Sequence, residues 1–236
     1  MKHSMKTMLA VGSVLATTVS AFGGIHVRSV FSEASLRYEN DGFGVPFFGG
    51  SEDEHEYVVD RRSTLGAARA EAGDDPAGTA WSSVGRYDDG MRYTVSQGLS
   101  YGSMYSDPVD FTGMMYSTLV LTIDHEMQLD YSFAWSMNSA RLTNGSFEIR
   151  RGSDTVHRRI YDAIDPAAGA SILLGPGTYS LTFRLRGSEA SGGMFPDWSS
   201  GNSRLLTTVN FSTIPAPGAL ALLGLAGCAW RRGRRV

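Results

Sequence analysis

The chain has 236 residues and a formal net charge of −3, with 28 glycines, 8 prolines and a single cysteine. This length suffices for one domain with a sizeable hydrophobic core. The acidic balance argues against nucleic acid as a partner, and a single cysteine excludes an intramolecular disulfide as a source of stability.

The N-terminal residues 1–21 have the three parts of a secretory signal peptide. Lys2 and Lys6 form a positively charged start, and an uncharged stretch of small apolar residues follows. The small residues that end this stretch predict cleavage between Ala21 and Phe22. A short N-terminal helix is the alternative, but the glycine and the β-branched residues of the segment are poor helix formers. We therefore expect an exported protein.

Residues 22–212 are expected to form a single exported domain. They contain all 24 acidic residues and 15 of the 21 basic ones, so the body carries 15 − 24 = −9 charges. This charge disfavours direct binding to anionic lipid as well as to nucleic acid. The body has neither lysine nor cysteine, so a packed core must supply its stability.

Alternation of apolar and polar residues predicts strands along the body. In the first half, strands are expected at 25–31, 35–39, 79–87 and 91–95. The second half alternates more strictly and predicts strands at 118–123, 129–137, 179–186 and 205–211. Residues 67–71 have helical composition but are too few for a stable helix, so a strand or loop is expected there.

Turn-forming residues separate these strands. Residues 124–126 are expected to connect two of them, and Asn144-Gly145 predicts a type I′ hairpin between 141–143 and 146–149. The body combines many short strands, frequent Gly, Asn and Asp turns and no amphipathic helix. This pattern predicts an all-β fold, an antiparallel β-sandwich that is jelly-roll-like.

One serine matches a hydrolase pattern. Residues 98–102, with Ser100 at the centre, fit the G-x-S-x-G nucleophile elbow, which requires a strand before the serine and a helix after it. Residues 103–112 contain Asp107-Pro108 and show no helical period. A glycine-flexed turn is therefore the simpler interpretation of this segment.

Motifs for metal binding are sparse. His125-Glu126 begins a zinc motif, but Leu129 stands where the second histidine belongs. His55 lies in an acidic stretch that we interpret as a solvated loop. Three acidic pairs in predicted loops permit a structural calcium without specifying one, and no other cofactor is predicted. The pairs are Asp88-Asp89, Asp107 with Asp110, and Asp162 with Asp165.

Aromatic residues form a candidate surface for stacking against sugar rings. The candidates are Tyr101, Tyr105, Tyr116, Phe195 and Trp198. Aromatic side chains of β-proteins more often fill the core, whereas a loop offers fewer core neighbours. Glycan contact is therefore predicted first at Trp198 and Phe195, which share one predicted loop.

The C-terminal residues 213–236 combine a proline break, a short apolar segment and an arginine cluster. Pro215 and Pro217 prevent a helix from starting before about Gly218. As a helix, residues 218–230 would reach about 20 Å, short of the roughly 30 Å hydrocarbon core of a bilayer. This segment is thus predicted to be a marginal transmembrane helix. The cluster is expected on the cytoplasmic side, with the body across the inner membrane; it consists of Arg231, Arg232, Arg234 and Arg235.

The order of Pro215-Ala216-Pro217, the apolar segment and the arginines resembles the PEP-CTERM sorting signal of exported bacterial proteins. Ala216 stands where the family has a glutamate. The resemblance covers the tail alone. It implies recognition by a membrane-embedded exosortase, removal of the hydrophobic segment, and a link to exopolysaccharide and biofilm in Gram-negative bacteria. An ordinary C-terminal anchor and a helix buried in the domain are the alternatives.

These features lead to three functional hypotheses. The first is a non-enzymatic protein that is tethered to the inner membrane as a precursor and then placed at the cell surface or in the extracellular matrix. Its role there would be structural or adhesive, with polysaccharide as the contact. The second is a carbohydrate-binding module supported by calcium. The third is a secreted hydrolase that uses Ser100 or a pair of carboxylates.

Overall fold

The computed structural model of the protein describes residues 24–40, 54–72, 78–101, 109–138, 141–161, 169–191 and 201–214. The predicted signal peptide, with its Ala21–Phe22 junction, and the predicted sorting signal from Pro215 onward lie outside these residues. Among the residues that the structure describes, no helix is long and apolar enough to cross a membrane.

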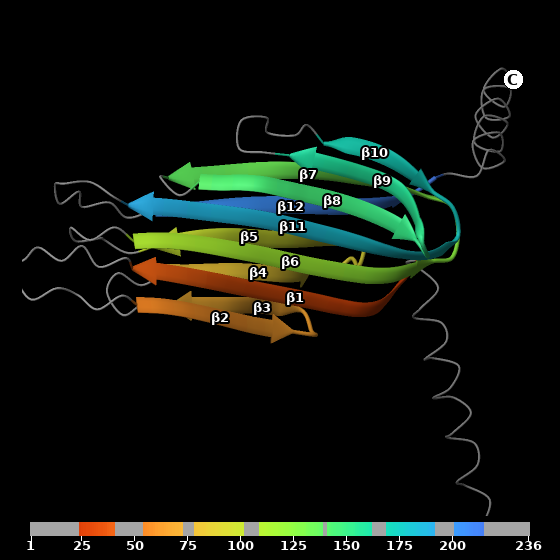
Figure 1. Ribbon diagram of the computed structural model, residues 1–236. Helices are drawn as coiled ribbons and strands as arrows, with labels where there is room; N and C mark the ends of the chain where they lie inside the picture. The colour runs from red at the N-terminus through yellow and green to blue at the C-terminus, as the bar shows by residue number, and fades with distance from the viewer. Residues whose placement is uncertain are drawn as a thin grey trace, which may run out of the picture.

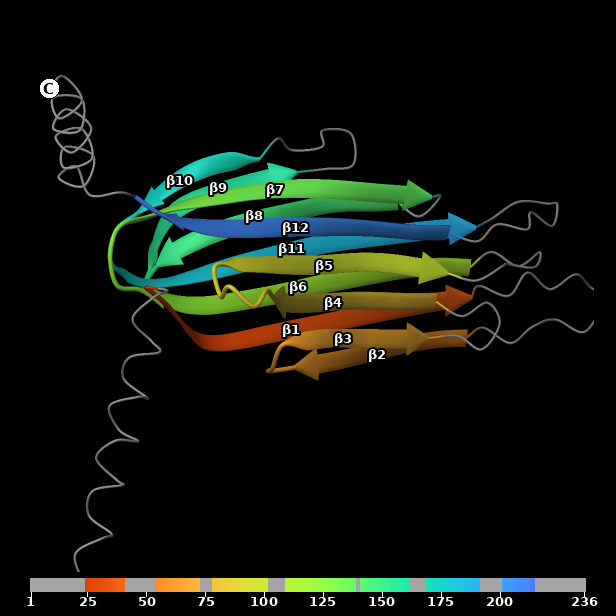
Figure 2. The ribbon, with the colours of Figure 1, turned by 180° about the vertical axis from the view of Figure 1, so that it is seen from behind.

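The described fold consists of β-strands that form two six-stranded antiparallel sheets packed face to face (Figures 1 and 2). The front sheet of Figure 1 has the order β2-β1-β6-β11-β8-β9, and the back sheet has the order β10-β7-β12-β5-β4-β3. The predicted antiparallel β-sandwich is confirmed. The strands are β1 (Ile25–Asn40), β2 (Glu54–Arg62), β3 (Gly66–Ala72), β4 (Gly78–Arg86), β5 (Arg92–Tyr101), β6 (Val109–Ile123), β7 (Met127–Asn138), β8 (Arg141–Arg151), β9 (Asp154–Tyr161), β10 (Ala170–Leu174), β11 (Gly177–Ser191) and β12 (Gly201–Thr213).

Strands with strict alternation in the sequence occur where they were expected. The predicted strand 129–137 lies inside β7, and 179–186 lies inside β11. The predicted turn at 124–126 connects β6 to β7, and it carries the chain from the front sheet to the back sheet. Residues 67–71 lie in strand β3, at the edge of the back sheet.

The predicted hairpin at Asn144-Gly145 is wrong. Both residues lie inside β8, where Gly145 pairs with Leu185 of β11 and with Tyr161 of β9. A Cβ atom at Gly145 would collide with the ring of Tyr161. The glycine therefore makes room for a buried ring on the next strand rather than for a turn.

The two sheets approach each other most closely along β1, β3, β4 and β6. Cα atoms of β1 lie within 8 Å of Cα atoms in β3 and β4, and the same holds between β4 and β6. Packed sheets are usually about 10 Å apart. Small core residues on these strands allow the approach, and a Cβ atom at Gly113 would already lie 3.3 Å from the Cβ atom of Ala80. We call them the small-residue seam: Ala34, Ala68, Ala70, Ala80 and Gly113.

Aromatic side chains fill the opposite side of the sandwich, between β7 of the back sheet and β8 and β9 of the front sheet. The ring centroids of Tyr131 and Phe147 are 4.8 Å apart, and those of Phe133 and Tyr161 are 4.7 Å apart. Trp135 packs edge-on against Tyr161 at 5.7 Å. The core thus changes from small to aromatic side chains across the width of the sheets.

A chain of buried polar groups crosses the sandwich beside the small-residue seam. Ser117 Oγ of β6 lies 3.0 Å from Ser32 Oγ of β1 and 2.7 Å from Ser82 Oγ of β4. Gln97 Nε2 of β5 donates to Ser82 Oγ at 3.2 Å and to the carbonyl oxygen of Phe183 at 3.4 Å. These side chains are almost fully buried, so the bonds offset the cost of removing them from water. A slip in register would break these hydrogen bonds, and the buried polar groups therefore specify how the two sheets align.

Replacing Ala80 with leucine tests the seam. The larger side chain has no space between β4 and β6, so we expect the free energy of unfolding to fall by about 1–3 kcal/mol. Ala134→Leu is the matched control, because Ala134 is exposed on the outer side of β7 and should change stability by no more than about 0.5 kcal/mol. Urea unfolding of both variants measures the difference. Equal effects of the two substitutions would contradict a tightly packed seam.

A pH dependence is expected from His157, whose Nε2 lies 2.9 Å from Tyr131 Oη and so joins β9 to the back sheet. Burial lowers the pKa of His157, and the charge of Arg159 lowers it further. The unfolded chain therefore binds this proton at a higher pH than the folded chain does. The stability that this site contributes is full above about pH 6.5 and is lost as the pH falls through the folded pKa.

His157→Gln removes this titration. The difference between the free energies of unfolding at pH 7.5 and pH 5 should be smaller in the variant than in the unchanged protein. Urea titrations at the two pH values test the prediction, and an identical difference in both proteins would refute it.

Candidate functional site

Ser100 does not lie in a nucleophile elbow. It lies within strand β5, where it pairs with Thr79 of β4 and Asn202 of β12. The glycine-flexed turn expected here is also wrong, because Gly98 is part of the same strand and lies beneath the indole ring of Trp81. In the described part of the chain, no hydrogen bond joins the Ser100 hydroxyl to a histidine.

Asp89, one of the loop carboxylates considered for calcium, has a role in a turn. Asp89 Oδ1 accepts hydrogen bonds from the backbone N–H groups of Met91 (2.9 Å) and Arg92 (3.1 Å), between β4 and β5. No group of three or more metal-ligating side chains occurs among the residues that the structure describes. Of the other carboxylates considered, Asp88 is exposed in the same turn, and Asp107, Asp110, Asp162 and Asp165 have no described side chains.

The aromatic residues predicted to meet sugar rings separate into three groups. Tyr101 is buried and stacks on Phe111 at 6.2 Å between ring centroids, so it belongs to the core. Tyr116 of β6 is half-buried and points away from the core. Tyr105, Phe195 and Trp198 lie outside the described residues. Tyr116 is thus the member of this set that the structure places on a surface.

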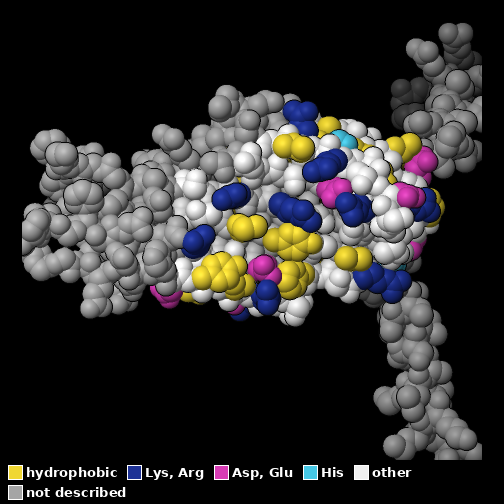
Figure 3. Space-filling view, viewed as in Figure 1, with side chains coloured by type: hydrophobic (Ala, Val, Ile, Leu, Met, Phe, Trp, Pro, Cys, Tyr) yellow, Lys and Arg dark blue, Asp and Glu magenta, His cyan; other side chains and the backbone are white. Residues whose placement is uncertain are grey.

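The outer face of the front sheet carries arginine, aromatic and aliphatic side chains side by side (Figure 3). Side chains alternate between the two faces of a strand, so the residues between core positions point outward here. We call this surface the arginine–aromatic face. Its members are Phe31, Tyr57, Arg61, Met114, Tyr116, Arg158, Ile160, Arg184 and Arg186.

Strand register aligns several of these residues in one row across the sheet. From the β2 edge to the β9 edge, the row is Arg61, Glu33, Tyr116, Arg184, Ser146 and Ile160. Neighbouring strands are about 4.8 Å apart, so the row spans roughly 24 Å. A cation, a carboxylate, an aromatic ring, a second cation, a hydroxyl group and an aliphatic side chain thus follow one another along a single line.

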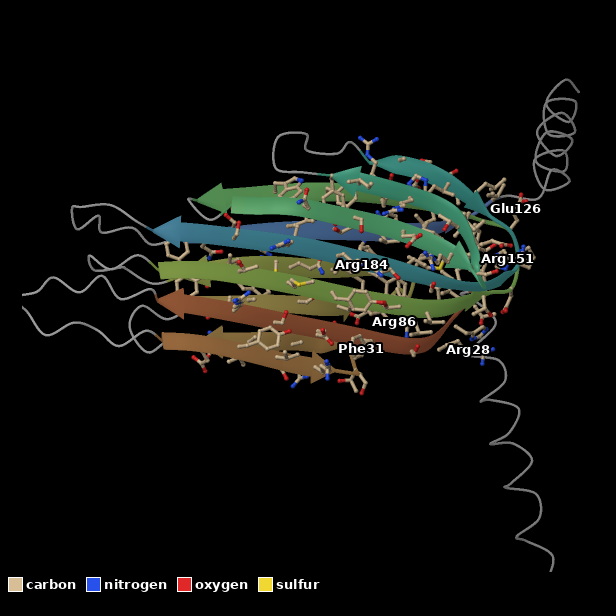
Figure 4. All side chains as sticks on the ribbon, viewed as in Figure 1. Arg28, Phe31, Arg86, Glu126, Arg151 and Arg184 are labelled. Atoms are coloured by element: carbon tan, nitrogen blue, oxygen red, sulfur yellow. The ribbon has the colours of Figure 1, made fainter. Side chains whose placement is uncertain are left out.

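Tyr116 is the centre of this face. The guanidinium carbon of Arg184 lies 5.6 Å from the centroid of its ring, and the ring of Phe31 meets it edge-on at 6.0 Å. The hydroxyl group of Thr118 donates a hydrogen bond of 2.7 Å to the Tyr116 oxygen. Figure 4 shows Phe31 and Arg184 on the strands of the front sheet. These contacts hold the tyrosine and the arginine in fixed positions at the surface.

An open groove of about 600 Å³ runs over this part of the sheet. This volume is within the range of about 300–1,000 Å³ that is usual for ligand sites. Its walls combine apolar and polar side chains, among them Tyr57, Met114, Asn144, Ser146, Arg158 and Ile160.

Large apolar side chains are unusually exposed around the groove. Tyr57 is 67 % exposed, Met114 59 % and Ile160 65 %. A single exposed apolar residue needs no explanation, but three that line one groove indicate a contact surface.

Each described carboxylate of this face is matched by an arginine. Arg61 Nε lies 2.7 Å from Glu33 Oε2, and this hydrogen bond raises the pKa of Arg61. Arg150 Nε lies 3.0 Å from Glu148 Oε1. Partial burial raises the pKa of Glu148, but hydrogen bonds from Arg150 and Thr155 outweigh that effect and lower it. Glu148 is therefore ionised at neutral pH. The described outward arginines of this sheet outnumber its carboxylates, which gives the face a positive charge.

The outer face of the back sheet has a different character. Its central positions carry small hydroxyl side chains, such as Thr94, Ser100 and Thr208. Trp81 is half-buried there and lies over Gly98, at which any Cβ atom would collide with the indole ring. The two faces of the sandwich thus offer different chemistry.

Sequence reasoning missed Arg184, Arg186 and Arg158. The alternation that predicts the strand at 179–186 places Phe183 and Leu185 in the core and the intervening arginines outside. Their neighbours on β6 and β9 follow from strand pairing, for which the sequence carries no local signal.

No family model and no curated protein matches this chain. Among solved structures, one match is the crystal structure of the infectious bursal disease virus VP2 subviral particle, at 11 % identity and a TM-score of 0.20. The match covers 81 % of this chain and 62 % of that chain, so the chain spans less than two thirds of the viral protein's length. A likeness at this level supports no argument about function.

Proposed function

We propose that the protein is an exported, non-enzymatic component of the cell surface or extracellular matrix that holds polysaccharide on its arginine–aromatic face. The export route rests on the sequence alone. The segment 1–21 directs secretion, and the tail that resembles a PEP-CTERM signal is read by an exosortase-like enzyme at the inner membrane. The tethered precursor is then released to the outside of the cell.

The observation that supports polysaccharide is the pair formed by half-buried Tyr116 and exposed Arg184, both of which line the groove. Pyranose rings present apolar C–H groups that pack on aromatic rings, and their hydroxyl groups hydrogen-bond to arginine, asparagine and serine side chains. The face offers these groups along a surface that crosses six strands. An extended surface suits a long chain better than a small molecule. The role proposed is therefore structural or adhesive.

Loss of Tyr116 should weaken glycan binding. Tyr116→Ala removes the ring on which a sugar would stack, and aromatic contacts of this kind are worth about 0.5–1.5 kcal/mol. We expect the Kd for exopolysaccharide purified from the producing bacterium to rise by about two- to tenfold. Affinity electrophoresis with the polysaccharide in the gel measures this change.

Tyr87→Ala is the matched control. Tyr87 is exposed and lies under Arg92 at 5.1 Å, near the back sheet, so it repeats the tyrosine–arginine contact away from the groove. Its replacement should leave the Kd unchanged. If Trp198→Ala abolishes binding while Tyr116→Ala does not, the site includes Trp198 instead. Absence of binding to every glycan would refute the proposed function.

The export route has its own test. The natural protein should lack residues 1–21 and the apolar tail segment, and its intact mass should show both losses. Recovery of the full-length chain from the cytosol would contradict the route.

A further inference from the structure

We propose that the arginine–aromatic face is specific for a polyanionic polysaccharide, whose repeating unit carries a carboxylate or a sulfate group. This inference rests on the proposed function and names the chemical class of its ligand. It follows from the distribution of charge on the front sheet, from the geometry of Arg184 and from the spacing of the arginines.

The charge of this face is opposite to that of the body. Residues 22–212 carry −9 charges, yet the described outward side chains of the front sheet include more arginines than carboxylates. Glu33 and Glu148 are already paired with Arg61 and Arg150. The outward arginines also include Arg158 and Arg184, which line the groove. A positive surface on an acidic protein concentrates anionic ligands at that surface.

Arg184 is held in a geometry that suits an anionic group. Its guanidinium lies 5.6 Å from the centroid of the Tyr116 ring, and the side chain remains exposed. A cation–π contact restricts the position of a guanidinium, whose N–H donors lie in its plane. Carboxylate and sulfate oxygens match such a planar set of donors, whereas a neutral sugar hydroxyl engages one donor at a time.

The arginines recur along the groove instead of converging on one point. Arg184 and Arg186 alternate on β11, about 6.6 Å apart, and Arg158 lies two strands away and two residues along the strand, at roughly 12 Å from Arg184. The groove between them is lined by Ser146 and Asn144, which are uncharged. A polymer that repeats its negative charge can meet several arginines at once, while a single anion can meet only one.

Nucleic acid is the other polyanion that binds arginine and aromatic side chains. The −9 charge of the body does not separate the two, because it acts on any polyanion outside this face. The proposed export places the protein among extracellular polysaccharides, so a glycan is the ligand proposed, and single-stranded DNA becomes an outcome of the test.

The test uses the full chain in mild detergent and four immobilised probes: polygalacturonate, dextran sulfate, neutral dextran and single-stranded oligothymidine. Biolayer interferometry at low and high salt gives each Kd. We expect binding to polygalacturonate or dextran sulfate at least tenfold tighter than to dextran. This binding should weaken at least fivefold between 0.05 and 0.5 M NaCl, because exposed charges are screened. A preference between the first two probes identifies the anionic group.

A double variant, Arg158→Gln with Arg184→Gln, should raise the Kd for the preferred acidic probe about three- to thirtyfold, since each exposed ion pair contributes modestly. Arg69→Gln with Arg92→Gln is the charge-matched control on the back sheet, and it should change that Kd less than twofold. Thermal melting of both doubles confirms that they fold. The comparison of dextran with dextran sulfate needs no variant.

The outcomes separate the two proposals. Failure to bind any glycan overturns the proposed function. Equal affinity for dextran and the acidic probes, or equal losses in the two double variants, overturns the polyanion inference while the proposed function stands. Tighter binding of oligothymidine than of both acidic glycans, lost in the front-sheet double, would assign the face to nucleic acid and overturn the inference.

Discussion

The close approach of the two sheets at the small-residue seam is the constraint on which the rest of the structure depends. Ala80 and Gly113 leave enough room for β4 and β6 to come within 8 Å of each other. Only at such a separation can Ser82 and Ser117 hydrogen-bond across the sheets at 2.7 Å. The same spacing therefore packs the alanines and satisfies the buried hydroxyl groups. If the sheets were farther apart, the alanines would lose their packing contacts. The buried hydroxyl groups would also lose their hydrogen bonds, and an unpaired buried hydroxyl group is costly.

The inward side chains of the sheets form this core, so only the outward side chains of each strand can contact a ligand. The two outer faces differ in the side chains that they present. The front sheet carries Tyr116 and Arg184, which support each other at the surface, whereas the back sheet carries mostly small hydroxyl side chains such as Thr94 and Thr208. A protein that contacts a long polymer needs only one such face. The other face then remains available to solvent or to a neighbour without competing for the same ligand.

The sequence predicts the sheet because period-two alternation is a direct consequence of the pleat, and the segments inside β7 and β11 show it clearly. The prediction from sequence fails where packing against a residue distant in the sequence requires a glycine. Asn144-Gly145 has the local signature of a hairpin, but Gly145 is small because Tyr161 of the next strand occupies the space above it. Gly98 is another such case, since it lies beneath Trp81. Tertiary packing overrides turn chemistry at both positions.

The candidate site could not be predicted from the sequence, for a related reason. Tyr101 and Tyr116 look alike in the chain, yet one stacks on Phe111 in the core and the other faces outward. The contact of Tyr116 with Arg184 joins β6 to β11, and it depends on a pairing that no local pattern specifies. The net charge of the chain does not predict a basic face either, because it sums the charges on all surfaces. An acidic chain can present a basic face when its arginines occupy the outward positions of adjacent strands.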